Sequence, residues 1–147
     1  MKKLMMMAVG CALAFAIAGC GKSSVANTPQ ELASMFGKAL VQQDKDALLK
    51  LCTSEAASGE EISELLKAFD DEKFKAEVKE LQGKNPVFSG EIKEPKTPDM
   101  AREIEEKFGA GAVIVEAIIT VDGRVSTGPC LAAKKVDGSW KVIDCTR

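Results

Sequence analysis

The stretch "AVIVEAIITVDGRVSTGPCLAAKKVDGSWKVIDC", residues 112–145, decides the fold, because two Asp-Gly pairs divide it into three β-rich runs. Asp-Gly is favoured in two-residue hairpin loops, since both central residues of a type I′ turn need a positive φ. The run 112–121 is rich in β-branched residues, and the runs 124–136 and 139–145 follow the two Asp-Gly pairs. They predict three consecutive antiparallel strands with tight turns at Asp122-Gly123 and Asp137-Gly138.

The segment before this stretch adds a strand and a helix. "PVFSGEIK", residues 86–93, predicts a first strand, with a β-bulge expected at Gly90. "TPDMAREIEEKFG", residues 97–109, opens with Thr-Pro and stops at a glycine, which are start and stop signals of a helix. The sheet is therefore expected to contain four strands, with one helix between the first two.

Helical signals dominate residues 28–83. Thr28-Pro29-Gln30-Glu31 combines an N-cap threonine, a proline at the first helical position and a capping-box glutamate. Asp44 is expected to cap a second helix, and the small, polar residues 53–61 separate it from a third and a fourth that ends near Gly83. Apolar residues that recur at helical spacing are expected to form the core: Leu32, Met35, Phe36, Ala39, Leu40, Leu48, Leu49, Ile62, Leu65, Leu66, Phe69, Phe74, Val78 and Leu81. The fold class is α+β, with N-terminal helices packed on a curved, cone-like, mainly antiparallel four-stranded meander.

The last hairpin predicts which face of the sheet is buried. A two-residue turn at 137–138 sets Ala133 opposite Val142 and Lys134 opposite Lys141. Two facing lysines need water, so Trp140 and Val142 are expected on the face that packs against the helices.

The same count sets Cys130 opposite Cys145, at a separation that a disulfide accepts. A Cys130–Cys145 disulfide is therefore expected, with Cys52 buried on a helix. A bond from Cys52 to one of the strand cysteines remains the competing arrangement. Neither a zinc site nor a redox-active pair is expected, because the chain has no histidine and no Cys-x-x-Cys spacing.

The N-terminal residues have the profile of an export signal. Lys2 and Lys3 precede an apolar run too short to span a bilayer, and small residues end it. Ile17-Ala18-Gly19-Cys20 resembles the bacterial lipobox, which implies that residues 1–19 form a signal peptide and that Cys20 receives a diacylglyceryl group. Residues 20–27 then form the lipidated cysteine and a polar tether. The resemblance implies a place in the cell envelope, facing the periplasm, and Gly21 favours the outer membrane if the host is Gram-negative.

Composition limits the partners of the remaining chain. Loss of residues 1–19 removes two basic residues and no acidic one, which leaves 18 basic against 22 acidic residues and a net charge near −4. This balance argues against binding to nucleic acid. Residues 28–147 suit a single domain.

The opening "TPQELASMFGKALVQQDKDALLKLC" and the closing "VDGSWKVID" resemble small bacterial lipoproteins of the nuclear-transport-factor-two-like group, which have a cystatin-like fold. That resemblance implies a sheet wrapped around a long helix, with a pocket at the wide end of the cone. Enzymes of this fold use Asp, His and Tyr, whereas this chain contains no His and no Tyr. No catalytic residue and no cofactor are therefore assigned.

Three residues are candidates for lining such a pocket. Glu116 interrupts an apolar run, and Asp144 is expected to share a face with Trp140. A buried carboxyl with a raised pKa acts as a base or binds a ligand. The favoured interpretation places Glu116 on the outer face of the sheet and Asp144 at a solvated strand end.

Three functions are consistent with these observations. The first is a non-catalytic binding module for a small molecule or an envelope protein, anchored to the membrane through the lipid on Cys20. The second is a lyase or isomerase that uses a buried carboxylate. The third is an accessory lipoprotein that acts by protein contact, which includes a homodimer formed through the outer face of the sheet.

Replacement of Cys20 tests the anchor. In Cys20→Ser the thiol that accepts the lipid is missing, so the protein is expected in the soluble fraction or as unprocessed precursor. Fractionation and mass spectrometry of the N-terminal peptide measure this. A processed variant that still fractionates with the membrane contradicts the lipobox interpretation.

Overall fold

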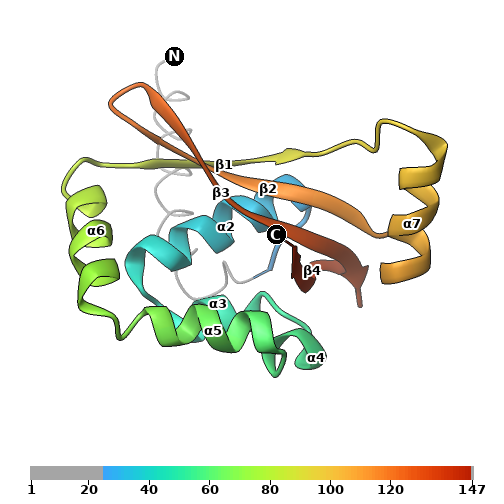
Figure 1. Cartoon of the computed structure of the whole chain (residues 1–147), viewed down its shortest axis with the longest axis horizontal. Coiled ribbons are helices and arrows are strands. Elements are labelled where there is room, and N and C mark those ends of the chain that lie inside the picture. The colour runs from blue at the N-terminus through green and yellow to red at the C-terminus, as the bar shows by residue number, and fades with distance from the viewer. Residues whose placement is uncertain (1–24, 147) are drawn as a thin grey trace, which may run out of the picture.

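A computed structural model describes residues 25–146, with no side-chain description for Thr146, and confirms the α+β class (Figure 1). The predicted signal peptide and Cys20 lie outside the described residues. Within that range, four strands form one antiparallel meander in the order β1-β2-β3-β4. They are β1 (Val87–Ile92), β2 (Val113–Val121), β3 (Arg124–Val136) and β4 (Ser139–Thr146). The sheet is open and does not close into a barrel.

The helices begin at the predicted caps. Thr28, Asp44 and Thr97 each accept a hydrogen bond from a backbone N–H of the first turn that follows. One helix was missed: α4 lies in the segment expected to be a loop, where the Thr53 hydroxyl accepts from the N–H of Ala56. The helices are α2 (Pro29–Gln42), α3 (Lys45–Lys50), α4 (Ser54–Ala57), α5 (Glu60–Ala68), α6 (Glu72–Gln82) and α7 (Pro98–Phe108).

Both hairpin turns are as predicted. Asp122 and Gly123 have φ values of 52° and 76°, and Asp137 and Gly138 have φ values of 50° and 86°. Positive φ at both central residues is the signature of a type I′ turn. The turns set Val121 opposite Arg124 and Val136 opposite Ser139.

The core lies between the sheet and α2. This helix packs along β1 and β2, and α3 and α5 lie on its far side (Figure 1). It buries residues around most of its circumference, as expected for a helix covered on two sides. Val142 is fully buried and Trp140 packs partly against the same core, which confirms the predicted buried face of β4. The largest fully buried side chains are Phe36, Leu32, Leu48, Leu51, Ile62, Leu131, Val115 and Val142.

Gly90 marks the point where α2 crosses β1. The expected β-bulge at Gly90 is wrong, because β1 and β2 pair without interruption from Val87 to Ile92. A Cβ at position 90 would instead collide with the carbonyl oxygen of Gln30 and would lie 2.8 Å from the Cβ of Ala33. The glycine therefore allows close contact between the helix and the strand.

Two bulges lie elsewhere in the sheet. Glu116 faces Cys130 and Ile118 faces Thr127, so Ala117 stands opposite both Gly128 and Pro129. A proline cannot donate to the ladder and is tolerated within a sheet at such a bulge.

The second bulge lies in β4. Ala133 faces Val142 as predicted, but Ala132 faces Asp144, so Ile143 is the extra residue. A one-residue bulge reverses the faces of the residues beyond it.

The register beyond Ala133 therefore corrects the predicted pairing of cysteines. Cys145 faces Leu131, and Cys130 faces Thr146, on the other face of the sheet. The expected Cys130–Cys145 disulfide thus loses its geometric basis.

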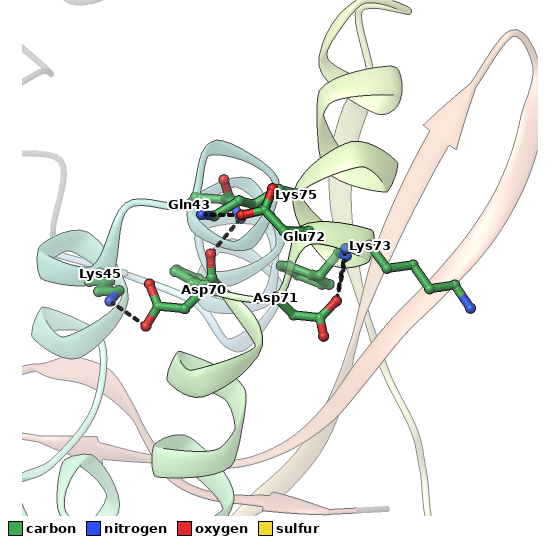
Figure 2. A network of polar contacts seen from close by, with 9 residues as sticks. Gln43, Lys45, Asp70, Asp71, Glu72, Lys73 and Lys75 are labelled. Atoms are coloured by element: carbon green, nitrogen blue, oxygen red, sulfur yellow. Dashed lines mark hydrogen bonds and ion pairs between the residues drawn. The ribbon is translucent and has the colours of Figure 1, made fainter.

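A polar network ties two helix junctions together (Figure 2). The side-chain amide of Gln43 donates to the carbonyl of Phe69 at 3.4 Å, and the ammonium of Lys45 lies 3.7 Å from the carboxylate of Asp70. Asp71 caps α6 by accepting from two backbone N–H groups. The network joins the α2–α3 turn to the α5–α6 turn.

Gly90→Ala tests the contact between α2 and β1. The added Cβ forces the helix away from the strand, so the free energy of unfolding is expected to fall by about 1–3 kcal/mol. Gly83→Ala is the matched control, because its Cβ meets only ordinary contacts and its φ is −70°. Denaturant unfolding of the two variants measures the difference, and equal midpoints contradict the account of this contact.

Candidate functional site

A cleft of about 250 Å³ lies between α7 and the sheet. Figure 1 shows α7 at the end of the sheet where β1 finishes and β2 starts. The walls are mainly apolar, and the charged side chains come from two of the three segments that line the cleft. The lining residues are Ile92, Lys93, Glu94, Pro95, Ala101, Ile104, Glu105, Gly111, Ala112, Val113 and Ile114.

Capping and turn residues at the two ends of α7 position this helix over the cleft. Thr97 caps the helix and Pro98 begins it. Gly109 ends it at a φ of 95°, and Gly111 turns the chain into β2 at a φ of 86°. Ala101 and Ile104 lie three residues apart on one side of the helix, and both line the cleft.

A charged cluster on the outer face of the sheet adjoins the cleft. The ammonium of Lys93, which also lines the cleft, lies 3.6 Å from a carboxylate oxygen of Glu116 and 3.6 Å from one of Glu91. The Glu116 side chain is only 15% exposed. Glu116 and, secondly, Glu91 raise the pKa of Lys93, so Lys93 is a cation at neutral pH. One cation thus stands between two carboxylates.

The Cys130 thiol lies beside the second oxygen of Glu116, with its Sγ 3.6 Å from Oε2. Burial and, secondly, the negative charge of Glu116 raise the pKa of this thiol. A raised pKa leaves little thiolate at neutral pH, and the thiolate is the nucleophilic form.

The cluster is therefore suited to holding charge and poorly suited to catalysis. A general base or nucleophile needs a pKa near the working pH, but the Lys93 and Cys130 pKa values have moved in the direction that suppresses both roles. Glu116 has a polar partner at each oxygen.

The three predicted pocket residues do not share one face of the sheet. Glu116 lies on the outer face, as the favoured interpretation expected. The bulge at Ile143 places Asp144 opposite Ala132, on that same outer face, which corrects the prediction that it shares a face with Trp140. Among the described residues, buried apolar side chains on the inner face of the sheet belong to the hydrophobic core.

Sequence reasoning missed the cleft, because no motif unites its three segments. The available signal was the apolar positions 101 and 104 on a helix placed between two strands. Such positions indicate that the helix packs on something, but they do not indicate that space remains beneath it.

Among the described residues, no three His, Cys, Asp or Glu side chains gather in a way that could hold a metal ion. In residues 25–146 no helix has the length and apolar character needed to cross a bilayer. No family model, curated protein or solved structure matches the chain.

Thiol alkylation tests the link between Glu116 and Cys130. Glu116→Gln removes a negative charge beside the thiol, so the pKa of Cys130 falls and its alkylation by iodoacetamide accelerates at a given pH. The midpoint of the pH–rate profile is expected at lower pH in the variant.

Glu91→Gln is the control, because Glu91 contacts Lys93 and not Cys130. Burial raises the pKa of the Cys52 thiol to about 12, so Cys52 stays unreactive in both variants. Mass spectrometry of the alkylated peptides gives the rates. An unchanged Cys130 profile in Glu116→Gln shows that the contact does not govern this thiol.

Proposed function

We propose that the protein is a lipid-anchored, non-catalytic binding module of the cell envelope, and that the α7 cleft receives a small ligand. The observation that carries the proposal is a mainly apolar cleft bordered by carboxylates. The lipobox-like sequence at Cys20 supports the anchor. The resemblance to nuclear-transport-factor-two-like lipoproteins agrees with helices packed on an open meander sheet.

The cleft favours a small ligand with an apolar body and a positive charge. Its volume of about 250 Å³ lies below the ~300–1,000 Å³ of drug-sized pockets. Glu94 and Glu105 line the cleft, while its one lysine, Lys93, is already held by Glu91 and Glu116. The local charge is negative, which attracts a cation and repels an anion.

A lyase or isomerase is not favoured by this arrangement. Such an enzyme needs an available carboxylate facing an enclosed cavity, whereas Glu116 has polar partners at both oxygens and lies on the outer face.

Protein contact through the outer face of the sheet is the second candidate. Val87 and Val125 are 64% and 65% exposed. Both pair with Thr120 of β2, Val87 from β1 and Val125 from β3, so the three residues form one row across the strands. Exposed apolar side chains on a sheet face are a feature of interaction surfaces. A partner or a second copy of the chain would then cover this row rather than the cleft.

Titration with phenethylamine, an apolar amine, tests the cleft. Amide resonances of residues 92–94 and 101–105 are expected to shift, and phenylacetate, an anion of similar shape, is expected to bind more weakly. Ala101→Phe fills the cleft and should weaken amine binding at least about tenfold, a change of ~1.4 kcal/mol.

Met100→Phe is the matched control, because residue 100 is exposed on the same helix and does not line the cleft. It should bind the amine as the wild type does. Equal binding by the two variants, or no shift at the cleft in the wild type, overturns the proposal.

A further inference from the structure

Residues 51–53 run along β4 on the side away from β3. Cys52 forms a parallel bridge with Val142, whose N–H donates to the carbonyl of Leu51 at 2.8 Å. The N–H of Thr53 donates to the carbonyl of Val142 at 3.0 Å. The ammonium of Lys141 also donates to the carbonyl of Lys50 at 2.7 Å. Two backbone hydrogen bonds and one hydrogen bond from a lysine side chain therefore hold the segment containing Cys52 against the strand containing Cys145.

The bulge at Ile143 turns Cys145 toward the same side. Cys145 faces Leu131, which is fully buried, and packs against the core cluster that contains Cys52. Cys130 instead lies on the outer face, beside Glu116. Of the two strand cysteines, only Cys145 thus shares the buried side of the sheet with Cys52.

We propose that Cys52 and Cys145 form a disulfide in the exported protein. An oxidising compartment permits such a bond, and the packing of residues 51–53 on β4 brings the two segments together before oxidation. Cys145 lies one residue before the end of β4, where the strand can adjust to disulfide geometry without disturbing the centre of the sheet.

The electrostatics of the two thiols agree with this arrangement. Burial raises the pKa of Cys52, and the Cys145 thiol is the second cause of the rise. Cys52 is therefore a poor initial nucleophile, and the first attack is assigned to Cys145, which lies nearer the end of β4.

The bond forms by two exchange steps with an organic disulfide as the oxidant. The Cys145 thiolate attacks this oxidant, forms a mixed disulfide and releases one thiolate. The Cys52 thiolate then attacks the Cys145 sulfur and releases the second thiolate. In total the two cysteines lose two protons and two electrons, and the oxidant's S–S bond is reduced to two thiols.

Tryptic mapping decides the linkage, because each cysteine lies on a different peptide. Cys52 lies in residues 51–67, Cys130 in 125–134 and Cys145 in 142–147. The full chain is expressed with its own N-terminal segment in an exporting bacterium, alkylated with iodoacetamide without reductant and digested. The expected products are a 51–67 peptide joined to 142–147 and an alkylated 125–134 peptide.

A peptide 125–134 joined to either partner as the dominant species overturns the proposal, and so does alkylation of all three cysteines. Thermal unfolding provides a second measurement. A reductant should lower the unfolding temperature of the wild type and of Cys130→Ala and leave that of Cys145→Ala unchanged. Equal effects on the two variants contradict the assignment.

Discussion

The close contact between α2 and β1 is the constraint on which the rest of the structure depends. Gly90 lets the backbone of α2 approach the strand near Gln30, and the helix then buries its apolar residues between the sheet and α3–α5. This contact fixes which face of the sheet is inner. The opposite face is left to the charged cluster of Glu91, Lys93 and Glu116 and to the exposed valines of the β1–β3 end. A larger residue at position 90 would separate the two layers that define both faces.

The two bulges determine which side chains each face presents. The bulge opposite Ala117 accommodates Pro129 and leaves Cys130 beside Glu116, where the thiol and the carboxylate lie 3.6 Å apart. The bulge at Ile143 moves Asp144 to the outer face and Cys145 to the inner one. The raised pKa of Cys130, which burial and Glu116 cause, is thus a consequence of backbone register. So is the position of Cys145 in the core near Cys52.

Local signals predicted most of the fold. The Asp-Gly turns, the Thr-Pro helix starts and the alternation in the last hairpin each act within a few residues, so the sequence is sufficient to identify them. The register beyond Ala133 was predicted incorrectly because Ile143 is β-branched and apolar, and neither a glycine nor a proline marks its bulge. The other bulge was not predicted either, although Pro129 lies in it and a proline within a strand is a signal for a bulge. The cleft depends on how closely α7 packs on residues 92–95 and 111–114, a tertiary distance that no local pattern encodes.

Hydrogen–deuterium exchange with and without phenethylamine tests most directly whether the α7 cleft is the binding site. Backbone amides of residues 92–94 and 101–105 are expected to gain protection in the presence of the amine, because the ligand reduces local opening of α7. The 121–126 hairpin, which includes the exposed Val125, is expected to exchange as before. Protection confined to that hairpin and residues 87–91 would contradict the account and would favour the outer face of the sheet as the interaction surface. No change in either region would also contradict the account.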